Sequence, residues 1–304
     1  MEGKYLITVV GPTAIGKTSL AIAIARHYNT EIISADSRQF YKEMSIGTAV
    51  PSADELAAVP HHFIQHKSIF DEYSVGDFER EAIQMLELLF KQHDVIVMVG
   101  GSGLYVDAIK HGLDNFPTIN KEVREALNQT LTNEGILSLQ EKLKILDRDY
   151  YDRVDLNNPH RLIRALEVCI GSGLPYSSFL NQEKAVRNFK PITIGISAER
   201  KTVYDRINQR VDMMLEQGLV QEVRSLEKQQ SLNALQTVGY RELFRYFDGD
   251  CDLDTAMAEI KKNTRRFAKR QLTWLKKKED IHWVDYKYDL NELLKTIEQE
   301  IYKQ

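Results

Sequence analysis

Short apolar runs rich in β-branched residues recur along the chain, and each is bounded by polar or turn residues. They lie at residues 5–10, 31–35, 94–99, 192–197 and 281–286. Runs of this length and composition predict strands that are buried on both faces. Segments with helical spacing of apolar residues lie between the runs, as at 20–25 and 78–89. Buried strands that alternate with amphipathic helices predict an α/β fold, a parallel sheet with helices on both faces.

The interval 114–189 interrupts this alternation, because it contains no clear strand and several helical patterns. One helix is predicted over 121–132. Another begins at Asn158 and Pro159, an N-cap residue followed by proline at the first helical position, and ends near residues 171–173. This interval therefore reads as an all-helical segment.

The strand pattern resumes at 192–197, so the helical interval lies between two parts of one sheet. We therefore expect a core domain of residues 1–113 and 190–304 with a helical insertion domain, 114–189, rather than two sequential domains. Two long helical patterns follow, at 203–227 with an interruption at Gly218 and at 256–278.

Composition excludes several classes of protein. Of 304 residues, 43% are hydrophobic and 28% charged, which excludes a disordered chain. A net charge of -4 excludes a uniformly basic coat for nucleic acid but not a local basic patch. Two distant cysteines make neither a disulfide framework nor a zinc motif. With no long apolar stretch and no leader pattern, we expect a monomeric cytoplasmic protein and no membrane partner.

Residues 11–18 fit the phosphate-loop pattern G-x-x-x-x-G-K-T, between a predicted strand and a predicted helix. Gly11 and Gly16 let backbone N–H groups turn toward an anion, and the helix N-terminus favours negative charge. Lys17 can bridge phosphate oxygens, and the Thr18 hydroxyl can hold Mg²⁺. The predicted fold is therefore a P-loop NTPase-like parallel sheet flanked by helices.

The position of Asp36 separates this chain from an ordinary nucleoside triphosphatase. Such enzymes usually place an aspartate at the end of a later apolar strand, whereas the run 94–99 ends in a glycine-rich turn, residues 100–103. Asp36 instead follows the early run 31–35, at the sheet edge where ligands bind in open α/β folds. It is a candidate metal ligand or general base, and the alternative is a loop or N-cap aspartate.

A set of motifs occurs in the order of one family. They are Gly11–Thr18, Asp36–Tyr41, Gly47–Pro51, His61-His62, Gly100–Tyr105, Asn158–Val168, Val238–Glu242 and Thr264–Trp274. The set extends over nearly the whole chain and is far more specific than any single motif. The sequence resembles bacterial-type tRNA dimethylallyltransferases, also called tRNA isopentenyltransferases.

The resemblance implies transfer of a dimethylallyl group from dimethylallyl diphosphate to the exocyclic N6 amine of the adenosine 3′ to the anticodon, with release of diphosphate. The phosphate loop would then hold an isoprenoid diphosphate and Mg²⁺ rather than a nucleoside triphosphate. The implied diphosphate-binding residues are Gly11, Pro12, Thr13, Ala14, Ile15, Gly16, Lys17, Thr18 and Arg241.

The residues fit this chemistry. Displacement at the allylic carbon leaves negative charge on the diphosphate, where Lys17 and Mg²⁺ on Thr18 would act. The attacking amine is weakly nucleophilic because its lone pair is delocalised into the ring. A carboxylate must orient it and take its proton, and by resemblance that group is Asp36.

The acceptor is expected to be the anticodon stem-loop of tRNA, with the adenine out of its stack. Ser37 and Gln39 could hydrogen-bond the flipped base or its neighbours, and Ser102 could line the channel between donor and acceptor. The helical insertion is expected to clasp the stem-loop. The implied tRNA contacts are Asp36, Ser37, Arg38, Gln39, Ser102, Arg124, His160, Arg161, Leu162, Ile163 and Arg164.

Residues 261–278 carry nine Lys and Arg and no acid, so this helix could follow an RNA backbone. Its apolar residues are interpreted as core packing rather than base-stacking platforms: Phe267, Leu272, Trp274 and Leu275. Three histidines, His61, His62 and His66, are interpreted as loop or substrate contacts rather than metal ligands, because no acidic residue completes a zinc pattern.

Three other functions remain open at this point. A P-loop nucleoside or nucleotide kinase would share the phosphate loop and the sheet. A prenyltransferase for free adenine nucleotides would need Asp36 but no RNA-binding surface. A non-catalytic RNA-binding module would bind tRNA without needing Asp36.

Overall fold

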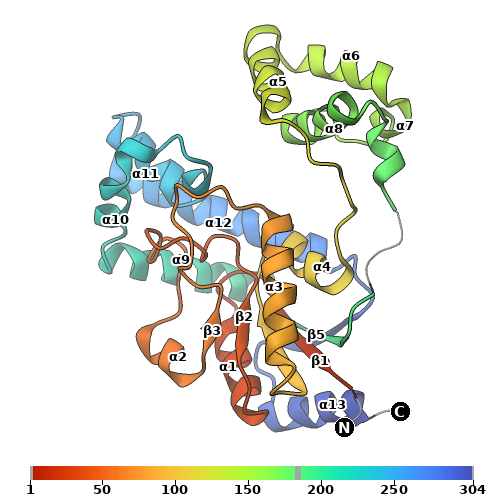
Figure 1. The fold of residues 1–304 in the computed structure, drawn as a ribbon. Coiled ribbons are helices and arrows are strands. Elements are labelled where there is room, and N and C mark those ends of the chain that lie inside the picture. The colour runs from red at the N-terminus through yellow and green to blue at the C-terminus, as the bar shows by residue number, and fades with distance from the viewer. Residues whose placement is uncertain (1–2, 182–185, 303–304) are drawn as a thin grey trace. The chain divides into compact units, whose positions relative to one another are not determined.

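The computed structural model describes residues 3–181 and 186–302. The chain divides into two compact units (Figure 1). The core unit consists of Met1–Lys110 and Arg187–Gln304, and the helical unit is His111–Val186. Each division falls three residues before the one expected from the sequence.

The described residues of the core unit form a six-stranded sheet with the strand order β3-β2-β4-β1-β5-β6, and every neighbouring pair is parallel. The strands are β1 (Tyr5–Val10), β2 (Ile32–Ser34), β3 (His61–His62), β4 (Val95–Val99), β5 (Lys190–Ser197) and β6 (Ile281–Asp285). The five predicted runs are confirmed as strands. The sequence did not reveal β3, because two histidines make no apolar run.

Helices cover both faces of the sheet. In the core unit they are α1 (Lys17–His27), α2 (Ala53–Ala58), α3 (Val75–Leu89), α4 (Gly103–His111), α9 (Arg200–Glu216), α10 (Leu219–Ser225), α11 (Tyr240–Phe247), α12 (Leu253–Leu275) and α13 (Leu290–Tyr302), with the short 3₁₀ turns η2 (Glu227–Gln229) and η3 (Asn233–Leu235). The predicted break at Gly218 is confirmed, since its φ of 100° ends one helix and precedes the next.

The two faces of β1 explain why nearly all of its residues are apolar, with buried Thr8 as the polar exception. Leu6 and Val10 belong to a core with α3, α10, α11 and α12. Ile7 and Val9 belong to a second core with α1 and α13. Successive side chains of a strand point to opposite faces, so a strand in a sheet covered on both sides reads as a nearly continuous apolar run. Burial of each such side chain stabilises the folded protein by about 1.5–3 kcal/mol.

The helical unit contains α5 (Lys121–Glu134), α6 (Ile136–Leu146), α7 (Arg148–Tyr151), α8 (Pro159–Ser172) and the 3₁₀ turn η1 (Tyr176–Phe179). Its own core includes Leu127, Leu139, Leu143 and Leu166. The predicted start of α8 is confirmed, because the Asn158 side chain accepts a hydrogen bond from the N–H of Arg161 at 3.2 Å.

Lys110 and Arg187, the residues of the core unit next to the two boundaries with the helical unit, form hydrogen bonds and ion pairs within the core unit. The Lys110 ammonium is buried and donates to Thr193 Oγ1 at 2.6 Å and Asp280 Oδ2 at 2.5 Å. The Arg187 guanidinium donates to the carbonyl of Ile109 at 2.9 Å and forms an ion pair with Glu79. The helical unit is thus inserted between two anchored points of the core. Among the described helices, none has the length and hydropathy needed to cross a membrane.

Candidate active site

Three loops meet where neighbouring strands end. The phosphate loop, Gly11–Thr18, follows β1, the segment Asp36–Gln39 follows β2, and the glycine-rich turn Gly100–Gly103 follows β4. Because β1, β4 and β2 are adjacent and parallel, their carboxyl ends lie at one edge of the sheet. A cavity of about 1330 Å³ opens there and is lined by residues of all three loops. This is the expected ligand edge of an open α/β sheet.

The phosphate loop has the conformation that its glycines allow. Gly11 and Gly16 have φ of 151° and 104°, which strongly favour glycine. A Cβ at Gly11 would lie 2.7 Å from the carbonyl oxygen of Ile196, so a side chain there would collide with β5. Gly11 and Pro12 are buried and shape the loop, whereas the other six residues of the phosphate loop line the cavity.

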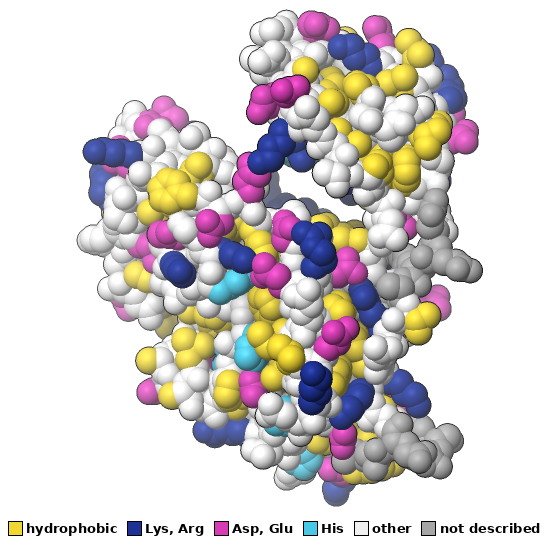
Figure 2. Space-filling view, viewed as in Figure 1, with side chains coloured by type: hydrophobic (Ala, Val, Ile, Leu, Met, Phe, Trp, Pro, Cys, Tyr) yellow, Lys and Arg dark blue, Asp and Glu magenta, His cyan; other side chains and the backbone are white. Residues whose placement is uncertain are grey.

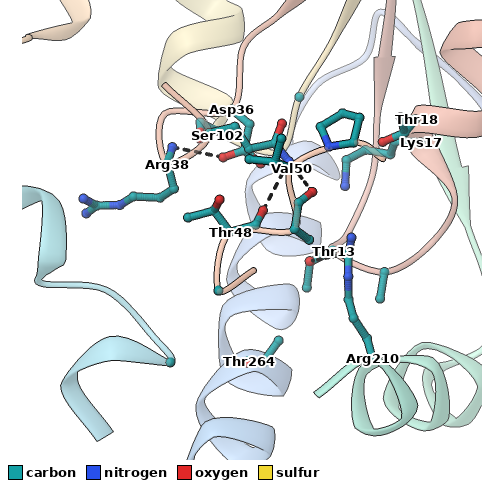
Figure 3. A pocket seen from close by; sticks show the side chains of 18 of the residues that line it. Thr13, Lys17, Thr18, Asp36, Arg38, Thr48, Val50, Ser102, Arg210 and Thr264 are labelled. Carbon is teal, nitrogen blue, oxygen red and sulfur yellow. Dashed lines mark hydrogen bonds between the residues drawn. The ribbon is translucent and has the colours of Figure 1, made fainter. Parts of the chain in front are cut away.

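Lys17 begins α1 and lines the cavity (Figure 3). Its ammonium donates to the carbonyl of Pro12 at 2.8 Å. Burial lowers the pKa of Lys17 to about 8, and the carboxylate of Asp36 partly opposes that shift. Thr18 also lines the cavity, where its hydroxyl is one hard oxygen donor.

Two arginines of α9 contact the phosphate loop, and sequence reasoning did not find them. Arg206 Nε donates to the carbonyl of Ala14 at 2.8 Å, and Arg210 donates to Thr13 Oγ1 at 3.3 Å. Burial lowers the pKa of Arg210, and Asp36 opposes the shift. In Figure 3 the Lys17 and Arg210 side chains point toward one another. The four-residue spacing of Arg206 and Arg210 was the available sequence signal for a basic helix face, since residues at this spacing share one face of a helix.

Asp36 is held beside these cations. Its Oδ1 accepts a hydrogen bond from the N–H of Arg38 at 3.1 Å, and its own N–H donates to Ser34 Oγ at 3.4 Å. Its charge acts on both Lys17 and Arg210. A carboxylate that lines a cavity next to an anion-binding loop can accept a proton from a bound amine.

The neighbours of Asp36 have different roles. Ser37 contacts Ser102 directly, with 3.1 Å between the two hydroxyl oxygens. The amide nitrogen of Gln39 donates to the carbonyls of Thr48 at 3.2 Å and Ala49 at 2.8 Å. Both amide hydrogens of Gln39 therefore hold a loop of the protein, and a contact of its amide oxygen with the acceptor base stays a prediction.

Arg38 and Arg241 were expected to contact ligands. The Arg38 guanidinium donates to the carbonyls of Asn233 at 3.2 Å and Ala234 at 2.9 Å, which fastens the Asp36–Gln39 segment to η3, and its contact with tRNA stays a prediction. Arg241 lies exposed in the first turn of α11 and lines the cavity. The cations that contact the phosphate loop come from α1 and α9, so binding of diphosphate by Arg241 stays a prediction.

Gln271 of α12 is a further residue that the sequence did not single out. Its side chain is buried; it accepts from the N–H of Thr13 at 2.9 Å and donates to the carbonyl of Gly101 at 2.9 Å. It thereby joins the phosphate loop to the glycine-rich turn.

The aromatic residues of α12 correct a sequence-based interpretation. Phe267 and Trp274 were interpreted as core residues, yet they are 39% and 41% exposed and both line the cavity. Leu275 is buried as predicted. Two exposed aromatic rings two helical turns apart, with Arg270 between them, form a surface suited to stacking on bases.

The basic stripe of α12 is narrower than its sequence suggests. Lys261, Lys262 and Lys278 form ion pairs with acidic side chains at 2.5–2.8 Å. Lys269 and Arg270 are exposed. Figure 2 shows basic and acidic side chains interspersed over the visible face, in keeping with the small net charge.

In the helical unit, His160 and Arg161 are exposed at the start of α8. Arg164 and Arg124 both approach the buried carboxylate of Glu167, at 3.1 Å and 3.7 Å. These four side chains can face a ligand. The side chains of Leu162 and Ile163 are 0% and 3% exposed and belong to the core of the unit, so a tRNA contact by these two residues stays a prediction that their side chains do not carry.

The three histidines occupy different surroundings. His62 Nε2 lies 2.5 Å from Glu31 Oε2, and His61 lines the cavity. His66 packs edge-on against Phe40, and burial lowers the pKa of His66 to about 4. Over residues 3–181 and 186–302, no cluster of three or more His, Cys, Asp and Glu side chains could hold a metal ion.

Comparisons with known proteins give the family. A family model described as IPP transferase matches residues 39–278. The tRNA dimethylallyltransferase of Christiangramia forsetii is 62% identical over 298 residues, 98% of this chain and 99% of the relative. The tRNA isopentenylpyrophosphate transferase of Bacillus halodurans has a similar structure, with a TM-score of 0.72 at 35% identity, over 98% of this chain and 95% of the other.

A eukaryotic dimethylallyltransferase, described as acting on tRNA, has a TM-score of 0.79 at 26% identity. The match covers 98% of this chain and 77% of that one. The sequence motifs, the fold and these relatives agree. The chain therefore belongs to the IPP transferase family, that of the tRNA dimethylallyltransferases, and is a prenyltransferase.

Proposed function

We propose that this enzyme transfers the dimethylallyl group of dimethylallyl diphosphate to the N6 amine of the adenosine 3′ to the anticodon of tRNA, releasing diphosphate. The observation that carries the proposal is the position of Asp36. Its carboxylate lines the same cavity as the phosphate loop and acts electrostatically on Lys17 and Arg210. A proton acceptor and an anion-binding loop are thus available to one reaction.

The donor diphosphate is proposed to lie against the phosphate loop. The positive end of α1 and the Lys17 ammonium favour the charge that grows on the leaving group. Arg210 supplies a second cation from α9 and is already fixed by Thr13. These groups bind the leaving diphosphate more strongly than the intact donor, which lowers the barrier.

Mg²⁺ is the proposed cofactor, and the donor set fits it. The Thr18 hydroxyl, which lines the cavity, is a hard oxygen ligand. Mg²⁺ commonly takes one or two protein oxygens and completes its shell with substrate phosphates and water. When bound, it would neutralise charge on the diphosphate.

The acceptor chemistry assigns one role to Asp36. Its carboxylate accepts a hydrogen bond from the N6 amine, which orients the lone pair toward the allylic carbon. The carbon–oxygen bond to the diphosphate breaks as the carbon–nitrogen bond forms, and the proton of the amine passes to Asp36. Ser102, which contacts Ser37 beside Asp36, is proposed to line the path between donor and acceptor.

The proposed RNA surface combines aromatic and basic side chains. Phe267 and Trp274 offer ring faces at the cavity, and Arg270 offers charge between them. In the helical unit, Arg161 and Arg164 are proposed to contact the anticodon stem-loop. We further propose that the enzyme is a cytoplasmic monomer.

Label transfer from radiolabelled dimethylallyl diphosphate with Mg²⁺ tests the proposal, using unmodified tRNA and AMP in parallel. We expect label on tRNA alone, its loss in Asp36→Asn, and wild-type transfer in Asp54→Asn, a control at an exposed aspartate of α2. Label on AMP would move the acceptor to free nucleotides. If neither tRNA nor AMP is labelled and ATP is consumed in the presence of a nucleoside, the alternative function as a P-loop kinase would be favoured.

A further inference from the structure

One wall of the cavity is a loop that belongs to no helix or strand. Residues 45–50 line the cavity, and their backbone turns without regular pairing. Ala49 has a φ of 52°, a conformation that non-glycine residues seldom adopt. Backbone groups in such a loop need partners from elsewhere if the wall is to keep its shape.

A single carboxylate supplies most of those partners. Glu222 of α10 accepts hydrogen bonds from the N–H of Ser45 at 2.9 Å and Ile46 at 2.7 Å through Oε2, and from that of Gly47 at 2.9 Å through Oε1. Three successive N–H groups that converge on one anion form a nest, and such charge-assisted bonds are strong.

Tyr240 completes this arrangement from α11. Its hydroxyl donates to Glu222 Oε1 at 2.7 Å, and its ring is fully buried. A Cβ at Gly47 would lie 2.5 Å from that ring, so only glycine allows the loop to pack there. Burial and the charge of Glu222 raise the pKa of Tyr240, so its hydroxyl remains a donor at neutral pH.

The opposite side of the loop is tied to the Asp36 segment. Gln39 donates to the carbonyls of Thr48 and Ala49. Glu222 thus holds the N–H groups of residues 45–47, while Gln39 holds two carbonyls later in the loop. Movement of the loop would therefore act on the segment that carries Asp36.

From this network we infer that Glu222 is a positioning residue for the transfer reaction. It touches neither donor nor acceptor in the proposed arrangement, and it acts by fixing residues 45–50 as the wall against which the reacting groups are aligned. The inference rests on the proposed function for its activity readout, whereas the hydrogen-bond network is independent of that function.

The test compares Glu222→Gln with Glu216→Gln, a control at an exposed glutamate at the end of α9. In Glu222→Gln, one oxygen becomes an NH₂ group that faces backbone donors, so the loop is released. We expect kcat to fall about 10- to 100-fold because alignment is lost. Affinity for inorganic pyrophosphate should stay within about twofold of wild type, since the phosphate loop is held separately by Gln271.

Hydrogen exchange gives a readout that does not depend on catalysis. Amides of residues 45–47 should exchange faster in Glu222→Gln, while those of β1 keep wild-type protection. Tyr240→Phe keeps the ring against Gly47 and removes one hydrogen bond, so its kcat should fall by about 3- to 10-fold. This second variant covers the case in which Glu222→Gln fails to fold.

The inference is overturned if a folded Glu222→Gln or Tyr240→Phe retains wild-type kcat, or if exchange at residues 45–47 is unchanged. The inference also fails if Glu222→Gln lowers both kcat and pyrophosphate affinity and speeds hydrogen exchange in β1. That result would mean that Glu222 stabilises the whole core unit rather than the loop. If wild-type enzyme transfers no label to tRNA, the proposed function fails instead, which separates the two.

Discussion

The Gln271 amide joins the backbone of Thr13 to that of Gly101, accepting from one and donating to the other at 2.9 Å. Loss of this side chain would remove the protein partner of a partly buried N–H and of a partly buried carbonyl at the cavity. Gln271→Ala should weaken pyrophosphate binding by about 10-fold. Each backbone group that loses its partner costs about 1–3 kcal/mol, and relaxation of the two loops relieves part of that cost. Competition against labelled donor measures it, with exposed Gln221→Ala as the control. Unchanged affinity would contradict this role.

Lys17 makes donor binding depend on pH. Its pKa in the free protein is about 8, below its ordinary value of 10.5 because of burial. Below pH 8 the ammonium is present and binds the diphosphate. Above pH 8 the amine must take up a proton on binding, so affinity should fall about tenfold per pH unit until the pKa of the complex is reached. Pyrophosphate titration from pH 7 to 9.5 measures it, and a flat profile would contradict the assignment.

The aromatic residues of α12 should affect tRNA rather than donor. Phe267→Ala and Trp274→Ala should each raise the KM for tRNA by about 5- to 100-fold, if each ring stacks on a base with about 1–3 kcal/mol. The KM for dimethylallyl diphosphate should change little. Steady-state transfer assays with one substrate varied at a time separate the two. A selective rise in donor KM would place these rings at the prenyl group instead.

Leu162 offers a test of whether a buried side chain of the helical unit affects tRNA binding. As a core residue it should tolerate Leu162→Met at a cost below about 1.5 kcal/mol, whereas Leu162→Ala should destabilise the unit by about 2–5 kcal/mol. Urea unfolding followed by circular dichroism measures both. The methionine variant should keep wild-type tRNA affinity, and Arg161→Ala should lose it. A methionine variant that folds normally yet binds tRNA poorly would restore Leu162 as a contact.

The sequence predicted those structural features that depend on residues close together in the chain. The five apolar runs, the Gly218 break and the Asn158 cap depend on neighbouring residues, and the structure has them where the patterns placed them. The phosphate loop was predictable for the same reason, since its glycines and lysine are consecutive.

What the sequence missed depends on contacts between distant segments. Arg210 lies 197 residues from its partner Thr13, and its four-residue spacing from Arg206 does not say which loop the two arginines face. Gln39 has the right chemistry for adenine, but a loop carbonyl occupies each amide hydrogen. Phe267 and Trp274 have core-like side chains, and only the fold shows that their helix face opens on a cavity.

The anchoring of Lys110 and Arg187 has a consequence for how this enzyme is assembled from parts. Both side chains complete their bonds inside the core unit, so the sheet and its loops are closed before the helical unit begins. A core unit that is closed in this way can accept a different inserted domain, or lose the one it has, because domain insertions are commonly tolerated at such junctions. The helical unit, proposed above to contact tRNA, could therefore be altered while the residues proposed for the chemistry stay in the core unit.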